Sequence, residues 1–195
     1  MKIFPHPVVI LDVETTGFSE TDDVIEIGAV CLDEYGRVRT EFGSLIQNQK
    51  PITAKEQRAL DKNNITESQL NDAPTLPVVS EAFISWWNGI PKEKGCLALA
   101  FNLKFDRMQM NSIGINLPWG ECLMLMTKQV MTHHNHILLN KNGQKKGQAS
   151  LKDACEFLGL TYPENAHRAL EDARVTALVA QRIVPMWHAM NNPPI

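Results

Sequence analysis

The segment VVILDVET, from Val8 to Thr15, constrains the fold of this chain more than any other. Its β-branched and apolar residues predict a buried central strand, which a Thr-Gly pair then breaks. Asp12 and Glu14 stand two residues apart in it, and the two-residue period of a strand places both carboxylates on one face. Buried like charges repel each other unless a cation pairs them or one carboxylate is protonated. The pair is therefore a candidate divalent-metal site, although Glu14 could also simply end the strand in water.

The order of the other elements predicts the fold class. Two more strand-like segments, residues 23–36 and 37–47, follow with short turns and imply an antiparallel meander. Residues 97–102 form another apolar strand, and segment 121–131 is interpreted as a strand running into a helix. Helical patterns are predicted over residues 54–60, 78–90, 104–114, 150–160 and 166–184. Strands first, and then strands alternating with helices, favour one mixed α/β sheet with helices on both faces.

Length and composition fit one globular domain spanning residues 1–195. Hydrophobic residues make up 44% of the chain and charged residues 21%, which argues against disorder and fibrous architectures. The net charge of −3 argues against a wide basic surface for nucleic acid, but it leaves room for a small site around bound metal ions. Residues 132–149 lack clear periodicity and form a candidate mobile loop, and the tail at residues 190–195 is expected to fray.

The cysteine pattern and the apolar segments indicate a cellular location. The four cysteines are scattered and form no CxxC pair, so we expect reduced core residues; they are Cys31, Cys96, Cys122 and Cys155. The apolar run near the N-terminus is too short for a signal peptide, and no stretch approaches membrane-spanning length. We therefore expect a cytoplasmic protein without a membrane partner.

Polar residues also follow the later apolar strand. Asp106 falls in the first turn of the next helix, where the helix dipole favours a carboxylate, so alone it is uninformative. Asn102 stands at the end of the strand itself, where open α/β sheets place their sites. We therefore include Asn102 among the candidate substrate-binding residues.

Asp172 and His167 lie at the start of the longest predicted helix. Asp172 lies beside the small-residue stripe around Ala169 and Thr176 that should face the sheet, so this acid needs a partner. His167 stands five residues earlier, about 140° around a helix, and cannot share the face of Asp172 if both are helical. Asn165 is a candidate N-cap that places His167 in the first turn or in the loop before it. An exposed first-turn histidine is the alternative.

Together these residues resemble a known family. The segments LDVETTG with Asp12 and Glu14, AFNLKFD with Asp106, and HRALED with His167 and Asp172 resemble the three motifs of the DEDDh 3′–5′ exonucleases in order and separation. The likeness covers residues 8–184 and extends to the proofreading subunit of bacterial DNA polymerase III and its freestanding or phage-encoded relatives. Each motif is weak alone, whereas the three together are specific.

The resemblance implies a ribonuclease H-like fold, with a five-stranded mixed sheet whose central strand carries the first two acids. It also implies two Mg²⁺ or Mn²⁺ ions, since hard cations prefer oxygen ligands, and the ligands would be Asp12, Glu14, Asp106 and Asp172. Such ions activate the attacking water and stabilise the in-line phosphoryl transition state. His167 would be the general base, a task that suits a near-neutral pKa. The residues placed at the terminal nucleotide are Thr15, Thr16 and Phe18.

The implied function is hydrolysis of phosphodiester bonds from the 3′ end of single-stranded DNA, which releases nucleoside 5′-monophosphates. DNA is expected over RNA, and partners in replication or repair are implied without an identity. An oligoribonuclease or RNA-trimming enzyme would carry the same five residues, because the choice depends on how the pocket treats the 2′-hydroxyl. A catalytically silent nucleic-acid-binding module is the alternative from another class.

The chain departs from the family pattern at two places. Many relatives have histidine where Phe101 stands, and they often carry His-Gly-Ile where residues 62–66 fall, so we expect a different nucleotide pocket. No clamp-binding or polymerase-binding extension is evident, which favours a freestanding enzyme over a proofreading subunit.

Other residues admit ligand-binding interpretations that we weigh against simpler ones. The loop histidines and Cys122 match no structural zinc spacing. Two adjacent tryptophans could stack on bases, but neighbouring helical positions do not share a face, so at least one is expected in the core. The loop lysines could hold substrate or simply be solvated. These residues are His133, His134 and His136, Trp86 and Trp87, and Lys141, Lys145 and Lys146.

Overall fold

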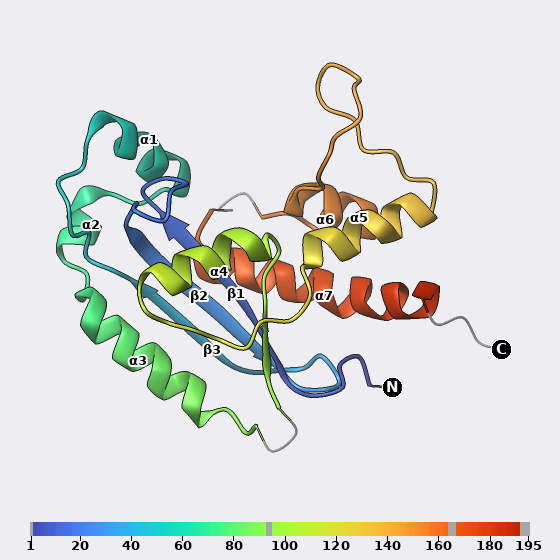
Figure 1. The fold of residues 1–195 in the computed structure, drawn as a ribbon. Helices are drawn as coiled ribbons and strands as arrows, with labels where there is room; N and C mark the ends of the chain where they lie inside the picture. The colour runs from blue at the N-terminus through green and yellow to red at the C-terminus, as the bar shows by residue number, and fades with distance from the viewer. Residues whose placement is uncertain (1, 93–94, 164–166, 192–195) are drawn as a thin grey trace.

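A central sheet between two groups of helices organises the computed structural model, which describes residues 2–92, 95–163 and 167–191 (Figure 1). The strands β1 (Val8–Thr15), β2 (Val24–Leu32) and β3 (Val38–Leu45) form the predicted antiparallel meander. β4 (Leu97–Leu99) pairs with β1 in parallel, which gives the order β3-β2-β1-β4. β1 therefore has a neighbour on each side, as predicted for a central strand.

The sheet has four strands among the described residues, so the expected five-stranded sheet is wrong. Segment 121–131, expected to begin as a strand, instead forms most of helix α5 (Leu123–His133). The physical reason is that its buried side chains recur at helical spacing, at Leu123, Met124, Met126, Thr127, Val130 and Met131. Beyond β4, Trp119 makes one isolated parallel bridge to Ala98.

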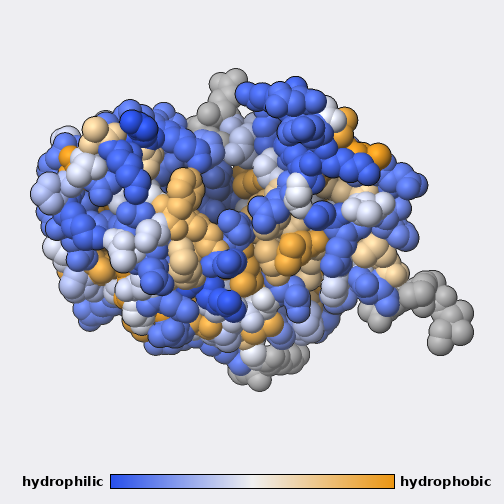
Figure 2. Space-filling view, turned by 45° about the horizontal axis from the view of Figure 1, so that its top comes forward, coloured by the Kyte–Doolittle hydropathy of each residue, from blue (hydrophilic) through white to orange (hydrophobic). Residues whose placement is uncertain are grey.

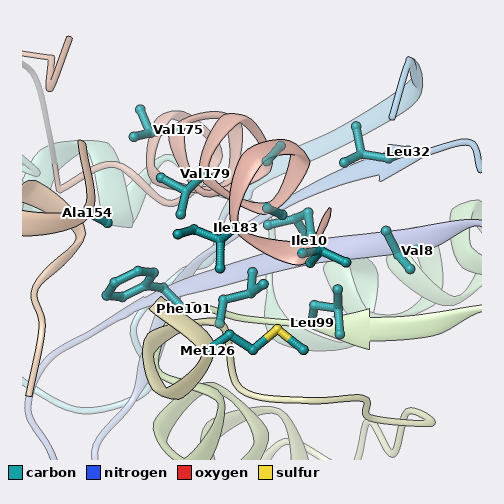
Figure 3. Close-up of a cluster of buried hydrophobic side chains, with 14 of the residues drawn as sticks. Val8, Ile10, Leu32, Leu99, Phe101, Met126, Ala154, Val175, Val179 and Ile183 are labelled. Carbon is teal, nitrogen blue, oxygen red and sulfur yellow. The ribbon is translucent and has the colours of Figure 1, made fainter. Parts of the chain in front are cut away.

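Helices cover both faces of the sheet, as predicted. α5, α6 (Leu151–Leu158) and α7 (Ala169–Asn191) lie together on one side, and α3 (Leu76–Gly89) and α4 (Leu103–Ser112) lie on the other (Figure 1). The side chains of Val8 and Ile10 in β1 join the core beneath α7, which Figure 3 shows with Val179 and Ile183 of that helix. Val9 and Leu11 join the opposite core. Asp12 and Glu14 continue the row of Val8 and Ile10, and therefore lie on the α7 face.

Two shorter helices lie beyond the carboxyl end of β1. α1 (Ala54–Asn63) has Thr53 as its N-cap residue in a capping box, and it begins where the sequence predicted a helix. α2 (Glu67–Asn71), which the sequence interpretation did not include, is capped by Thr66 and is too short to show a helical period. Both pack on a small core formed by Ile25, Leu60, Ile65 and Leu70.

The longest helix continues beyond its predicted end. α7 was expected to end at Val184, but it runs to Asn191 with Pro185 inside it. A helix is expected to end before a proline because a proline removes a backbone hydrogen bond. In the structure, Trp187 Nε1 donates to Gln129 Oε1 at 2.6 Å, which holds the extension against α5. Most of the tail predicted to fray lies outside the described residues.

The predicted loop at residues 132–149 contains a hairpin, which projects from α5 and α6 in Figure 1. Leu139 and Lys145 form its antiparallel bridge. Lys146 Nζ donates to both carboxylate oxygens of Asp153 in α6, at 2.8 and 2.9 Å. Lys128 Nζ in α5 donates to the carbonyl oxygen of Gly147 at 2.6 Å. Residues 137–147, the hairpin from here on, are therefore anchored at their base to two helices.

The structure also places the cysteines and the two adjacent tryptophans. All four cysteines are free; Cys31, Cys96 and Cys155 are buried, as expected for core residues, whereas Cys122 is only partly buried. Trp87 lies in the core, and Trp86 packs against Phe42 and Phe83 while its Nε1 donates to Thr40 Oγ1 at 3.0 Å. Packing therefore accounts for both tryptophans. Among the described residues, the helices lack the length and apolar character needed to span a membrane.

Candidate active site

The carboxyl end of β1 carries the first two predicted site residues. Asp12 and Glu14 are partly exposed on the face that α7 covers, and their strand partners are Gly28 and Glu26 of β2. The predicted shared face is therefore confirmed. Because both carboxylates remain partly accessible, they can contact a bound ion or ligand.

Asp106 reaches the same site from the opposite side of β1. It lies in the first turn of α4, as predicted, and is 2% exposed. Its Oδ1 accepts a hydrogen bond from the backbone N–H of Val13 at 3.2 Å, which ties the start of α4 to the strand between the two acids. Asn102 is the exposed N-cap residue of α4, and its side chain makes no capping hydrogen bond.

Asp172 and His167 come together at the start of α7. Asp172 lies in the first helical turn and is 7% exposed, and its Oδ2 accepts from the backbone N–H of His167 at 3.1 Å. His167 lies in the loop before the helix with φ 75°, a left-handed conformation that costs a non-glycine residue about 1–3 kcal/mol. The predicted N-cap Asn165 falls outside the described residues. Glu14, His167 and Asp172 each offer a ligand atom within 4.8 Å of those of the other two.

The acids of this site destabilise one another's charged forms. Burial and repulsion by the neighbouring acids raise the pKa of Asp12 well above its ordinary value. Burial, with repulsion from Asp172, raises the pKa of Glu14 to about 8. Burial raises the pKa of Asp106 to about 7, against the hydrogen bond from Val13. Without a cation, these carboxyl groups therefore hold protons at pH values where isolated acids are charged.

The donor set fits divalent metal ions. Asp172 Oδ1 is buried and has no hydrogen-bond partner among the described residues, which is costly unless another group contacts it. Four carboxyl groups that repel one another are stabilised by nearby positive charge. Their oxygen atoms are the ligands that Mg²⁺ and Mn²⁺ prefer. Among the described residues, Glu14, His167 and Asp172 form the one cluster of three potential ligands.

The surroundings of His167 favour its neutral form. Partial burial lowers the pKa of its imidazole, and the positive charge of Lys62 lowers it further, whereas Asp172 raises it. A neutral imidazole has a free nitrogen lone pair that accepts a proton. The electrostatics of this loop therefore suit a base.

A pocket of about 330 Å³ extends from Glu14 along the loop after β1 to α1. The exposed Phe18 and the half-buried Phe105, with ring centroids 6.2 Å apart, lie on this pocket. Lys55, Arg58 and Lys62 of α1 line it on the other side. Sequence reasoning missed these three cations, although their spacing of three and four residues was a signal that they share one helix face.

Thr15 and Thr16 were predicted to contact the terminal nucleotide, but their hydroxyl groups form hydrogen bonds within the loop after β1. The Thr15 hydroxyl donates to the carbonyl oxygen of Gly17, and Thr16 Oγ1 accepts from the backbone N–H of Asp23 at 3.0 Å. Both threonines are buried, whereas Phe18 is 84% exposed. The two hydroxyls therefore shape the loop that presents Phe18.

The departure at residues 62–66 has a structural explanation. Asn64 is the C-cap of α1 with φ 53°, a left-handed conformation in which glycine is most common and asparagine is tolerated. Asn64 can therefore stand where relatives carry glycine. Asn63 is buried on the pocket, and Lys62 adds a positive charge there.

Comparison with known proteins agrees with this geometry. A family model described as exonuclease, RNase_T, matches residues 9–180. Ribonuclease T from Buchnera aphidicola is 30% identical over 207 residues, which cover 97% of this chain and 88% of that protein. The PolC-type DNA polymerase III of Thermotoga petrophila is 31% identical over 183 residues, which cover 91% of this chain but 12% of the polymerase. The chain thus spans about an eighth of the polymerase it matches.

A solved structure shows the same fold at low sequence identity. Exonuclease I superposes with a TM-score of 0.74 at 15% identity, over 96% of this chain and 42% of that one. This likeness supports the ribonuclease H-like, mixed α/β fold expected from the sequence, with four strands described here. The match of the exonuclease family model over residues 9–180, together with the similarity to Ribonuclease T over most of both chains, shows that this chain belongs to the RNase T-like exonuclease family.

Proposed function

We propose that this exonuclease removes nucleotides one at a time from the 3′ end of single-stranded DNA and releases nucleoside 5′-monophosphates. The observation that carries the proposal is the convergence of Glu14, His167 and Asp172, with ligand atoms within 4.8 Å, beside the buried Asp106. Acids that repel one another at the end of a central strand suit a metal-dependent phosphodiesterase. The adjoining pocket with its cations suits a polyanionic strand.

We assign two divalent ions, Mg²⁺ or Mn²⁺, to this site, with Asp12, Glu14, Asp106 and Asp172 as their ligands. Ions bound there would supply Lewis-acid activation of water and would stabilise the charge of the in-line phosphoryl transition state. The unpartnered Oδ1 of Asp172 and the raised pKa values of the other three acids support this assignment.

The side chains around the proposed metal site would accept the proton of the attacking water and bind the substrate. The neutral ring of His167 accepts the proton of the attacking water, and the hydrogen bond from its backbone to Asp172 holds the loop in place. The exposed ring of Phe18 offers a stacking surface for the terminal base. Lys55 and Arg58 lie where they can neutralise phosphates of the bound strand. Asn102, exposed at the start of α4, remains a candidate for a polar contact to the substrate.

RNA trimming is the second candidate function. The likeness to Ribonuclease T favours it, because that match spans nearly the whole of both chains. The likeness to a DNA polymerase favours DNA, although it covers a small part of the polymerase. The two substrates differ in the 2′-hydroxyl, so the discriminating contact lies at the sugar of the terminal nucleotide.

Digestion of matched DNA and RNA single strands, labelled at the 5′ end and supplied with Mg²⁺, tests the proposal. We expect products that shorten progressively from the 3′ end, with DNA degraded faster than RNA. Faster degradation of RNA would favour the second candidate. Substrates that remain intact in both series would reject the exonuclease proposal.

An Asp12→Ala variant tests the metal assignment in the same assay. We expect no cleavage, while the fold is retained without metal, because the substitution removes a source of like-charge repulsion. The matched control is Glu81→Ala, which removes an exposed acid from α3 and should leave the rate unchanged. An Asp12→Ala enzyme that cuts at the wild-type rate would refute the assignment.

A further inference from the structure

Glu26 is a buried acid beside the site that the motifs do not include. It pairs with Glu14 in the register of β1 and β2, and paired residues of an antiparallel ladder lie on the same face of the sheet. Its side chain is buried, and its charge contributes to raising the pKa of Glu14, after burial and Asp172. Glu26 therefore adds negative charge to a site that is already repulsive, so its presence needs a structural explanation.

The partners of Glu26 are the two residues that follow His167. Arg168 Nε lies 3.1 Å from both carboxylate oxygens of Glu26, and Arg168 Nη2 donates to Oε1 at 2.8 Å. The backbone N–H of Ala169, the first residue of α7, donates to Oε2 at 3.0 Å. One buried carboxylate thus satisfies a free N–H at the helix start and binds a guanidinium by several hydrogen bonds.

Gly28 holds the same helix start against the sheet. A Cβ atom at Gly28 would lie 2.1 Å from the carbonyl carbon of Ala169 and 2.2 Å from the backbone nitrogen of Leu170. The backbone of β2 is therefore in direct contact with the first turn of α7. Glu26 and Gly28 stand two residues apart in β2, and together they hold the first turn of α7 against this strand.

We infer that the Glu26–Arg168 pair is a positioning device that holds His167 and Asp172 against Glu14. The inference rests on the proposed function of that site. His167 has a left-handed backbone, which persists in a non-glycine residue when the surroundings over-determine it. Those surroundings are the bond from its N–H to Asp172 on one side and the clamped Arg168 on the other. Loosening the clamp lets the loop relax and moves the imidazole away from Glu14.

The test is a Glu26→Met/Arg168→Met double variant, which removes one charge of each sign and replaces a largely buried ion pair by apolar side chains of similar length. Such replacements of an ion pair are often neutral for stability, but the N–H of Ala169 also loses its acceptor, so the melting temperature should fall only slightly below that of the wild type. We expect kcat to fall roughly ten- to hundred-fold while KM changes by less than about two-fold. Mn²⁺ affinity measured by calorimetry should fall by about ten-fold or more, because Asp172 is no longer held in place.

The matched control is Glu41→Met/Arg174→Met. This pair also ties α7 to the sheet, through β3, with Arg174 Nε donating to Glu41 Oε1 at 3.0 Å, but it lies farther along the helix and is more exposed. The control should keep wild-type kcat and Mn²⁺ affinity. Equal decreases in both double variants would assign the Glu26 pair a general docking role and overturn the inference.

The remaining outcomes also decide the matter. A Glu26→Met/Arg168→Met enzyme with wild-type kcat and Mn²⁺ affinity overturns the inference. If that variant does not fold, the single Glu26→Gln variant, which keeps one acceptor oxygen, must show the same selective decrease in kcat; unchanged kcat in a folded Glu26→Gln enzyme overturns it. A wild-type enzyme inactive on every oligonucleotide would refute the proposed function, and Mn²⁺ affinity would still test the positioning.

Discussion

His167 combines three properties that bear on its role in the site. Its backbone is left-handed, its N–H is bound by an acid of the site, and its pKa is lowered by burial and by Lys62. A ring nitrogen of His167 also lies within 4.8 Å of a carboxylate oxygen of Glu14 and of Asp172. Both a general base and a metal ligand are compatible with that position, and the two roles predict different effects of substitution.

A His167→Ala variant distinguishes the two roles. As a base, the histidine should contribute roughly a hundred-fold to ten-thousand-fold to kcat, and the variant should retain Mn²⁺ affinity because all four carboxylates remain. The wild-type rate should fall on acidification, since protonation removes the lone pair that accepts the proton, and this limb should vanish or move in the variant. Metal-coordinated water can titrate in the same range, so the variant carries the test. Unchanged turnover would refute the base, and a parallel decrease in Mn²⁺ affinity would favour a ligand.

Two basic elements compete for the role of holding the strand. On α1, Lys55, Arg58 and Lys62 line the pocket that contains Glu14. On the hairpin, Lys141 and Lys145 are exposed, whereas Lys146 is engaged by Asp153. The sequence-based hypothesis treated all three loop lysines alike, but Lys146 anchors the hairpin, and its substitution would disturb the anchor as well as any interaction with substrate. Figure 2 shows that this face of the molecule also carries apolar surface surrounded by hydrophilic surface.

The two elements can be compared through the salt dependence of KM. A Lys55→Ala/Arg58→Ala variant should raise KM and flatten its dependence on salt, by about 0.7 in the logarithmic slope for each phosphate of a single strand that is no longer neutralised. A Lys141→Ala/Lys145→Ala variant should act in the same direction if the hairpin holds substrate. The control is Lys2→Ala/Arg39→Ala, which removes exposed cations near the other end of β1. A hairpin variant with the salt dependence of the control would show that its lysines are simply solvated.

For the whole molecule, the site should couple stability to pH and to metal. Glu14 has a pKa of about 8 in the folded protein against an ordinary value of 4.5, and that of Asp106 is about 7 against 3.8. The folded state therefore binds more protons than the unfolded state up to about pH 8, so stability falls as pH rises through this window. His167 has a lowered pKa and acts in the opposite direction, but that contribution ends above its ordinary value of 6.5.

Thermal unfolding of the metal-free protein between pH 6.5 and 8.5 tests this coupling. We expect the melting temperature to fall across the range and Mg²⁺ or Mn²⁺ to raise it more at pH 8.5 than at pH 6.5, because metal binds the deprotonated carboxylates. A Glu14→Gln/Asp106→Asn variant should show a flatter pH profile and a smaller metal effect. A metal-free wild type whose melting temperature rises over this range would contradict the site electrostatics.

Local patterns were sufficient to predict much of this molecule. The period of β1 placed Asp12 and Glu14 on one face, because side-chain alternation is a property of any strand. Capping residues and helical spacing located most helices, since a helix is specified by neighbours three and four residues apart. The order of three motifs indicated the family before any distance was known. Where periodicity was ambiguous, in segment 121–131, the interpretation erred toward a strand.

The assembly of the site, in contrast, depends on contacts between residues far apart in the chain. In the sequence, Glu26 is an acid in an apolar strand. Its partner Arg168, 142 residues later, is revealed only by the packing of the start of α7 on β2. The α1 cations line the site because that helix folds back beside the end of β1. Lys146 became an anchor through Asp153. No local period encodes these partners, because burial and pairing follow from how the elements pack, and packing determines which charges face one another.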